Sequence, residues 1–306
     1  MDERWGIDLG GTKVEGAVLA DGADDPSGCL LRLRIDSEAD QGYEHLLSRI
    51  LVLIERIEQE LGRMRPQRIG FGTPGSCDPE TRLMRNCNST ALNGRPLQGD
   101  LEQLLGVRVL IENDANCFTL AEARWGAAKG RSNAFCVILG TGVGGGIVFD
   151  GRIVRGLHGI AGEWGHNPLV SGTDAAPCYC GKSGCVETVL SGPALERFYT
   201  EHAEQTLPLA RIAQRDADSV DPVATRTIDR LCMGFGQAIA TVVNILDPEA
   251  IVVGGGVSNV ARLFRDAPGV AARSVFHDRF STPILPPKLG DSAGVFGAAM
   301  LDPGDR

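Results

Sequence analysis

The chain has 306 residues and a formal net charge of −9 at neutral pH. This length fits one large domain or two of ordinary size, and the acidity argues against binding to nucleic acid, whose phosphates attract basic surfaces. No apolar run reaches the roughly 18 residues of a membrane span, and the start of the chain, Met1-Asp2-Glu3-Arg4, lacks the basic end and apolar stretch of a signal peptide.

The first predicted element is a β-hairpin whose turn is rich in glycine. An apolar strand reaches Asp8, the turn follows, and a second apolar strand ends at an Asp-Gly pair at residues 21–22. Glycine lets backbone N–H groups approach phosphate oxygens, and a threonine and a lysine can add a hydrogen bond and positive charge; the turn residues are Gly10, Gly11, Thr12 and Lys13. Asp8 would suit a water-bridged Mg²⁺ ligand. The alternative is an ordinary tight turn.

A helix–strand–strand–helix succession follows this hairpin. Apolar residues at helical spacing predict a helix over about residues 42–61, and short apolar runs predict strands over 68–72 and 107–112. The second strand delivers Asn113 and Asp114 to the start of a helix predicted over 115–129. An aspartate at a helix start keeps its charge and could accept the proton of an attacking hydroxyl. The alternative is that Asp114 only caps the helix. The Asn113 amide suits a polyol.

A second hairpin is predicted about 130 residues after the first, too far apart for a solenoid repeat. Its turn contains Gly140, Thr141, Gly142, Val143 and Gly144. The glycines also match the pattern G-x-G-x-x-G, but that fingerprint must open a helix, and residues 146–149 read as a strand. We therefore interpret the segment as a second phosphate-binding hairpin and the chain as a duplicated domain.

The next segment carries the spacing of a metal site. Three cysteines and a histidine complete a tetrahedral Zn²⁺ set and leave no open position, so the site is structural; the ligands are His166, Cys178, Cys180 and Cys185. Glu163 and Glu187 flank it, so the same loop could serve a binding pocket, although a zinc site remote from any chemistry is the alternative. The other six cysteines read as small core or near-core residues in a reducing cytoplasm: Cys29, Cys77, Cys87, Cys117, Cys136 and Cys232.

The last third of the chain supplies a third glycine turn. Pro222 begins a long helix that Asp247-Pro248 ends, and a strand over residues 250–253 follows. Gly254, Gly255 and Gly256 then lead into another helix, where the backbone could pass close to a ribose or an adenine ring, or simply form a helix-entry turn. The mixture of hairpins, crossover helices and glycine-ended strands indicates the α/β class.

These motifs together resemble the ROK family of sugar kinases over essentially the whole chain. The resemblance implies an actin-like, hexokinase-type fold of two duplicated α/β domains around a cleft, one formed by residues 1–114 plus 291–306 and the other by 115–290 with the zinc loop 163–187. It also implies ATP, Mg²⁺, a structural Zn²⁺ and phosphoryl transfer to a hexose, by a cytoplasmic protein that is a homodimer.

The resemblance also assigns residues to roles. Asp114 matches the general base, and the zinc ligands match the four residues named above, with His166 contacting zinc and sugar through its two ring nitrogens. The sugar contacts are Asn113, Glu163, His166, Glu187, Gly75 and Asn88. The nucleotide loops are Asp8 with Gly10, Gly11, Thr12 and Lys13, then Gly140, Thr141, Gly142, Val143 and Gly144, then Gly254, Gly255, Gly256 and Val257.

Four loops favour fructose, and also mannose, as the acceptor sugar. Residues 74–76, 86–90, 92–94 and 177–182 resemble those of bacterial fructokinases. An N-acetylglucosamine kinase or a glucokinase of the same family is the alternative. A different class is a sugar-responsive repressor or a non-catalytic sensor, but the chain starts at the first phosphate-loop strand, is acidic and keeps Asp114.

Overall fold

The computed structural model describes residues 3–87 and 89–302, and the chain divides into two compact units. The first comprises Met1–Gly130, Gly146–Ala161 and Lys288–Arg306, and the second Arg131–Gly145 and Gly162–Pro287. These bounds differ from those of the expected domains, because residues 115–130 and 146–161 group with the N-terminal part. One cause is that helix α3 (Asp114–Arg124) packs on helix α9 (Ala293–Ala299).

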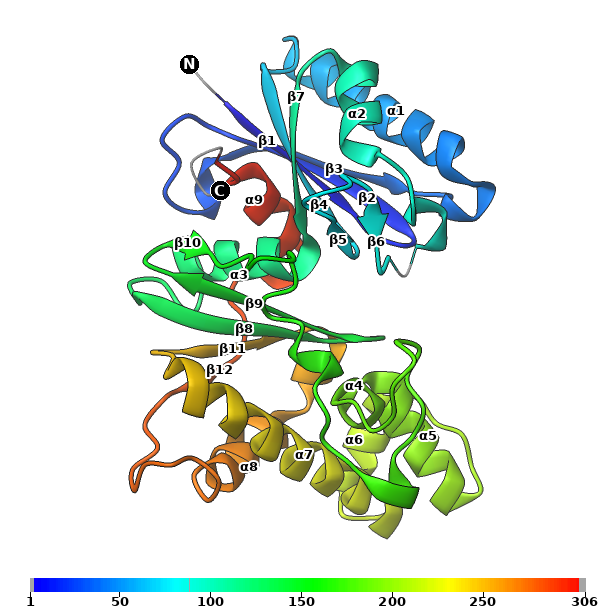
Figure 1. The fold of residues 1–306 in the computed structure, drawn as a ribbon, viewed down its shortest axis with the longest axis vertical. Helices are drawn as coiled ribbons and strands as arrows, with labels where there is room; N and C mark the ends of the chain where they lie inside the picture. Colours follow the sequence, from blue (N-terminus) through cyan, green and yellow to red (C-terminus); the bar gives the residue numbers. More distant parts are fainter. Residues whose placement is uncertain (1–2, 88, 303–306) are drawn as a thin grey trace. The chain divides into compact units, whose positions relative to one another are not determined.

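The first sheet contains the predicted hairpin. Its strands lie in the order β3-β2-β1-β4-β7, with β1 antiparallel to β2, β2 antiparallel to β3, and β1, β4 and β7 parallel (Figure 1). Their bounds are β1 (Arg4–Leu9), β2 (Lys13–Leu19), β3 (Cys29–Asp36), β4 (Arg68–Thr73) and β7 (Arg108–Asn113). The hairpin and both predicted strands that follow it are confirmed to within one residue.

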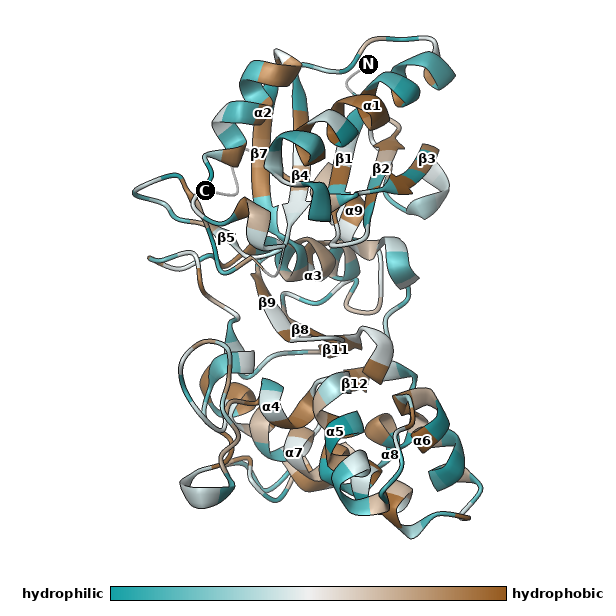
Figure 2. Cartoon of the chain, turned by 90° about the vertical axis from the view of Figure 1, so that its right-hand side faces the viewer, coloured by the Kyte–Doolittle hydropathy of each residue, from teal (hydrophilic) through white to brown (hydrophobic). Residues whose placement is uncertain are grey.

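Helices cover both faces of this sheet. On one face α1 (Tyr43–Leu61), predicted from its apolar stripe, and α2 (Leu97–Leu105) share an apolar core with Trp5, Ile7 and Leu9 of β1. Figure 2 shows β1 and β7 as hydrophobic strands beside an amphipathic α1. On the other face α9 lies directly on the backbone of β1 and β4, because a Cβ on Gly6 or Gly70 would overlap its main chain.

Helix α3 is shorter than predicted. It ends at Arg124, not at Lys129, because the buried Glu122 carboxylate takes over the backbone groups beyond the helix end. Its oxygens accept hydrogen bonds from the N–H of Ala127 at 2.7 Å and of Lys288 at 3.0 Å. The chain therefore turns away after Arg124, and the turn is tied to the segment before α9.

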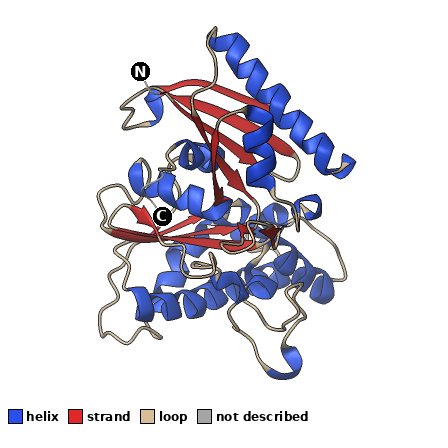
Figure 3. Cartoon of the chain, turned by 45° about the horizontal axis from the view of Figure 1, so that its top comes forward, coloured by secondary structure: helices blue, strands red, loops and turns tan. Residues whose placement is uncertain are grey.

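The second five-stranded sheet has the order β10-β9-β8-β11-β12, drawn in red in Figure 3 with the other strands. The predicted second hairpin is found as the neighbouring strands β8 and β9, and β8 is parallel to β11. The bounds are β8 (Asn133–Leu139), β9 (Val143–Phe149), β10 (Arg152–Ile153), β11 (Ile251–Gly254) and β12 (Ile284–Leu285); a separate small ribbon pairs β5 (Ser76–Cys77) with β6 (Met84–Arg85).

The helices of the second unit pack around α7 (Pro222–Leu246). Its predicted start and end are confirmed: Asp221 caps it by accepting from the N–H of Val223, and Asp247 ends it in a left-handed conformation with φ of 42°. The other helices of this unit are α4 (Glu187–Leu190), α5 (Gly192–Ala203), α6 (Leu209–Ala217) and α8 (Ala261–Ala271). In the two units together, short 3₁₀ turns lie at Pro26–Gly28, Ala39–Gln41, Thr90–Leu92, Trp164–His166, Gly172–Asp174, Gly256–Asn259 and Gly290–Ser292.

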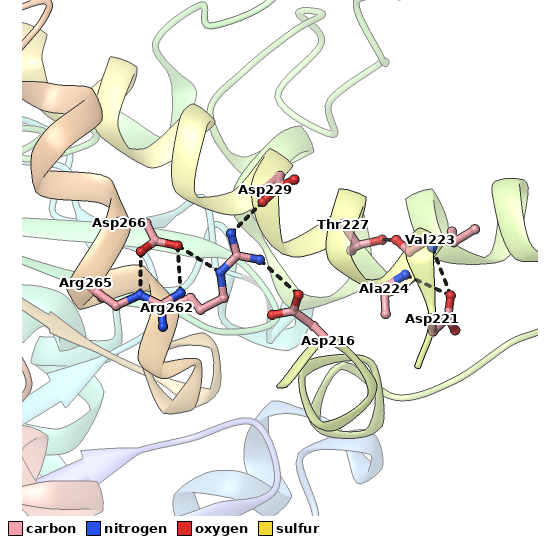
Figure 4. Close-up of polar contacts among 9 residues, drawn as sticks. All are labelled: Asp216, Asp221, Val223, Ala224, Thr227, Asp229, Arg262, Arg265 and Asp266. Carbon is pink, nitrogen blue, oxygen red and sulfur yellow. Dashed lines mark hydrogen bonds and ion pairs between the residues drawn. The ribbon is translucent and has the colours of Figure 1, made fainter. Parts of the chain in front are cut away.

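One arginine ties three of these helices together. Arg262 of α8 contacts the carboxylates of Asp216 in α6 at 2.9 Å, Asp229 in α7 at 2.6 Å and Asp266 of its own helix at 2.8 Å (Figure 4). Across the described residues, none of the helices combines the length and apolar character needed to span a bilayer.

Candidate active site

The predicted base lies where strand β7 becomes helix α3. Asn113 is the last residue of the strand and the helix cap: its Oδ1 accepts from the N–H of Ala115 at 2.9 Å, and its Nδ2 donates to the carbonyl of Gly75 at 2.9 Å. Asp114 follows as the first helical residue, and its Oδ1 also accepts from Ala115 N–H, at 2.7 Å. The structure thus brings Asn113, Asp114 and Gly75 together. Asn88, expected in the same group, lies outside the described residues.

Asp8 is close to this junction. Burial, together with the negative charges of Asp114 and Glu15, raises the pKa of Asp8 to about 7. Two glycines leave room for its carboxylate: a Cβ on Gly72 would lie 3.2 Å from Oδ1, and one on Gly294 would lie 2.8 Å from Oδ2. The negative charges of Asp8 and Asp114 repel each other, so a positive charge near the two carboxylates would be favourable.

The first glycine turn is fixed by hydrogen bonds within the turn and from Ser37. The Gly10 N–H donates to the carbonyl of Lys13 at 2.9 Å, closing the turn. The buried Ser37, at the end of β3, donates its N–H to the Thr12 carbonyl and its hydroxyl to the Gly11 carbonyl, both at 2.9 Å. These hydrogen bonds fix the shape of the turn, and all four residues, 10–13, are exposed at the surface. Ser37 was not expected to support this turn, because it belongs to no recognisable motif.

The second glycine loop contacts the predicted sugar-binding segment inside the second unit. The Val143 N–H donates to Oε2 of Glu187 at 2.9 Å, and a Cβ on Gly142 would lie 2.8 Å from the same oxygen. A Cβ on Gly165 would overlap the Val143 carbonyl. The loop therefore fits against the residues on either side of the cysteine cluster only because these positions lack side chains.

The third glycine turn lies beside the second. Strand β11 pairs with β8 so that Gly254 is opposite Ile138, and Gly255 has φ of 81° with its Cα against the backbone of Leu139. Any other residue at Gly255 would be strained and would overlap the Leu139 carbonyl. The turn over residues 254–257 and the loop over 140–144 therefore lie next to each other at one edge of the second sheet.

Trp164 fixes the segment that carries Glu163 and His166. Its ring is 4% exposed and makes edge contacts with Phe135 of β8, at 5.8 Å between centroids, and Phe235 of α7, at 6.1 Å. Its indole N–H donates to the Gly144 carbonyl at 3.3 Å. Burial raises the pKa of the neighbouring Glu163. The apolar anchor thus places two polar side chains within one 3₁₀ turn.

The four expected metal ligands form a compact cluster. One ligand atom from each of the four residues lies within 4.8 Å of all the others, namely His166, Cys178, Cys180 and Cys185. The Cys178 sulfur is 3.6 Å from Nδ1 of His166, and the sulfurs of Cys180 and Cys185 are 3.7 Å apart. Tetrahedral Zn²⁺ at its usual bond lengths would set sulfur–nitrogen and sulfur–sulfur separations of about 3.6 and 3.8 Å. The residues present therefore fit zinc in both donor type and spacing.

His166 directs its two ring nitrogens differently. Nδ1 faces the cysteine sulfurs, while Nε2 lies 3.1 Å from the hydroxyl of Tyr179, whose side chain is 74% exposed. Tyr179 was not expected in the site, although it stands between two of the cysteines. The second nitrogen is thus available for a polar group at the surface, where Tyr179 now lies.

Comparison with known proteins identifies the relatives of the chain as a whole. The ROK family matches residues 4–304. An N-acetyl-D-glucosamine kinase of Photobacterium profundum is 33% identical over 97% of this chain and 98% of its own. The ROK hexokinase of Thermus thermophilus is 32% identical and superposes with a TM-score of 0.85, covering 97% of both chains. A ROK family glucokinase of Streptomyces griseus, solved with glucose and AMPPNP, is 28% identical with a TM-score of 0.79, covering 97% of this chain and 98% of the other.

Proposed function

This chain belongs to the ROK family and has its actin-like fold, and we propose that it transfers the γ-phosphoryl group of ATP to a hexose hydroxyl. The observation that carries the proposal is the junction of β7 and α3, where Asp114 lies at a helix start beside Asn113 and close to Asp8. Carboxylates placed in this way serve proton removal and cation binding, which are the two needs of phosphoryl transfer.

Asp114 acts as the general base in this mechanism. Its carboxylate accepts the proton of the sugar hydroxyl while that oxygen forms a bond to the γ-phosphorus; the bond from the γ-phosphorus to the bridging oxygen breaks, and ADP leaves with its electron pair. The hydrogen bond from Ala115 N–H holds one carboxylate oxygen in place. Mg²⁺, when bound, neutralises charge on the phosphates, and Asp8 would hold it through water.

The glycine loops bind the nucleotide. The backbone N–H groups of residues 11–12 and 141–142, which are not used in the hydrogen bonds of the two turns, suit phosphate oxygens, and the turn over residues 254–257 suits the ribose or the base. Support comes from the way these turns are built: each is fixed by neighbouring backbone or by a buried side chain, such as Ser37. A fixed set of donors stabilises transferring charge without reorganising during the reaction.

The acceptor sugar has two candidates. The curated relative that is 33% identical is an N-acetyl-D-glucosamine kinase, which favours an N-acetylated hexosamine. The loops at residues 74–76 and 177–182 favour fructose, with mannose as a second substrate. In both cases the sugar hydroxyls form hydrogen bonds with Asn113, Glu163, His166 and Glu187. The zinc site holds the last three of these residues in position. Two curated relatives, 33% and 34% identical over 97% of this chain, are N-acetyl-D-glucosamine kinases, which supports the first candidate more strongly.

A coupled assay of ADP release tests both levels of the proposal. We expect ATP turnover that depends on added sugar, with the kcat/KM for N-acetylglucosamine or fructose exceeding those for glucose and mannose. Varying the concentration of each sugar in separate assays gives these kcat/KM values and distinguishes the two candidates. If no hexose stimulates ADP release above the rate with ATP alone, the kinase proposal is wrong.

Two further properties belong to the same proposal. The nine thiols of the chain suit the reducing cytoplasm, and we propose a homodimer, as the family resemblance implies. Sedimentation velocity with and without sugar measures the second property directly, and a single species of monomer mass would contradict it.

A further inference from the structure

A buried carboxylate next to the proposed base has three partners. Glu112 of β7 is 7% exposed. Its Oε1 accepts from the N–H of Asn113 at 3.0 Å and from Nδ2 of Asn116 at 2.9 Å, and its Oε2 pairs with Nε of Arg155. The carboxylate therefore binds Asn113, the residue before Asp114, and Asn116, two residues after it.

Arg155 reaches Glu112 from a different part of the first unit. It follows strand β10, and the chain around it is fixed: Val154 N–H donates to the Ile147 carbonyl at 2.9 Å, and the Arg155 carbonyl accepts from Ala161 N–H at 3.1 Å. The loop between residues 155 and 161 is thus closed at its base. Arg155 therefore approaches Glu112 from a constrained backbone, with 30% of its side chain exposed.

The guanidinium also stands among the carboxylates of the proposed site. Burial is the main cause that raises the pKa of the Cys117 thiol, and the charges of Glu112, Asp8 and Asp114 add to it, while that of Arg155 opposes it. All four groups are therefore within electrostatic reach of one buried sulfur. Arg155 therefore brings a positive charge to a place where three carboxylates gather.

We propose that Arg155 is a positioning residue for the Asn113–Asp114 junction, acting through Glu112; this rests on the proposed kinase function. Arg155 compensates the Glu112 charge, so that Glu112 keeps both oxygens as acceptors and holds the two asparagine groups that flank Asp114. Without Arg155, Glu112 is a buried charge with no cation on Oε2, and its carboxylate can turn away from both asparagine groups. The direction of the Asp114 carboxylate would then be less well fixed.

The test compares single and double variants of the pair. In Arg155→Gln the buried carboxylate loses its partner, and we expect kcat to fall about 10- to 100-fold, as for a base displaced by a fraction of an ångström, with a smaller change in ATP KM. The double variant Glu112→Gln/Arg155→Gln carries a neutral pair, and we expect kcat to recover to within about fivefold of the parent, since neutral replacement of a buried ion pair is often tolerated. Arg155→Lys should fall between parent and Arg155→Gln.

Arg152→Gln is the matched control, because Arg152 is exposed on strand β10 and its side chain makes no hydrogen bond or ion pair with the described residues; this variant should match the parent. Each kcat is normalised to the folded fraction, measured by circular dichroism, so that instability is separated from misplacement. The role is refuted if Arg155→Gln stays within twofold of the parent, or if the double variant is no more active than the single one. A parent with no sugar-dependent ADP release refutes the kinase function itself.

Discussion

The Glu187 carboxylate accepts the Val143 N–H at 2.9 Å, which joins the end of the cysteine segment to the second glycine loop. Glu187 begins helix α4, two residues after the last cysteine, and its other oxygen lies 4.0 Å from the Cys178 sulfur. A residue proposed to bind the sugar therefore also shapes a loop proposed to bind phosphate. Changes at Glu187 should consequently affect both substrates.

Replacing Glu187 separates these two contributions. Glu187→Ala removes the acceptor for Val143, and because a hydrogen bond to a charged group contributes about 1.5–3 kcal/mol, we expect the KM for ATP to rise about 10-fold or more. Glu187→Gln keeps a carbonyl acceptor, so its ATP KM should stay within a few-fold of the parent. Both variants should raise the sugar KM. Steady-state kinetics with each substrate varied measures this; equal ATP KM values in parent and Glu187→Ala would contradict the link.

The cysteine cluster should hold one metal ion per chain. Metal analysis of the purified protein should find about one zinc, as four ligands at this spacing require. Cys180→Ser removes a ligand, so we expect loss of the metal, a lower Tm and a raised sugar KM, because residues 163–187 lose their staple. Structural zinc contributes on the order of 10 kcal/mol in isolated fingers; the effect here should be smaller, since Trp164 anchors the segment independently.

Cys29→Ser is the control for this experiment, because Cys29 lies on strand β3 outside the cluster and its thiol is not part of a disulfide. It should keep the metal and the parent's Tm. A purified parent that contains no zinc, and whose Tm does not change with a chelator, would show that the cluster is not a metal site.

Asp114→Asn tests the base directly. Loss of a positioned base costs about 10²- to 10⁴-fold in rate, and asparagine keeps the size of the side chain and an oxygen for the Ala115 N–H. We therefore expect kcat to fall by that factor while the Kd values for sugar and nucleotide, measured by calorimetry, change little. Turnover within a few-fold of the parent would remove Asp114 from the mechanism.

Much of this architecture could be predicted because the signals are local in the sequence. The turn between β1 and β2, the stripe of α1 and the boundaries of α7 each depend on residues within one element and its caps. The four-residue metal cluster could also be predicted, because zinc prescribes both the residue types and their spacing.

The features that were missed join residues far apart in the chain. Ser37 supports the first glycine turn from another strand, and the end of α3 depends on Glu122 meeting Lys288 across most of the sequence. The pairing of Glu112 with Arg155 belongs to the same class. No periodicity or spacing announces such contacts, because they are created by the fold itself.

The stabilisation from Arg262, which is shared by three helices, should be lost in acid. Hydrogen bonds from Arg265 and Arg262 lower the pKa of Asp266 to about 2. Because this value lies below that of the unfolded chain, near 3.8, the stabilisation is present above about pH 4 and is lost as the pH falls toward 2. Arg262→Gln should therefore lower the free energy of unfolding at pH 7 by about 1–3 kcal/mol and reduce its fall below pH 4.

Urea denaturation across this pH range measures both effects. The control is Arg265→Gln: Arg265 is 71% exposed, so water screens its ion pair, and this variant should lose less stability at pH 7 than Arg262→Gln. If the two variants are equally stable at pH 7, the contacts of Arg262 with Asp216 and Asp229 contribute nothing.

Two glycine-to-alanine changes should have opposite effects on stability, because Gly70 lies in close contact with α9 and Gly99 lies in an open position. Gly70→Ala would drive a Cβ into the Ala298 carbonyl, and since neither backbone can move freely, we expect a loss of about 3 kcal/mol or more in the free energy of unfolding. Gly99 lies exposed inside α2, with ordinary φ and nothing within 4 Å of a built Cβ. Gly99→Ala should therefore stabilise the protein by about 0.5–1 kcal/mol, the difference in helix propensity. Equilibrium unfolding in urea measures both values, and Gly70→Ala as stable as the parent would mean that α9 does not rest on β4 in the way described.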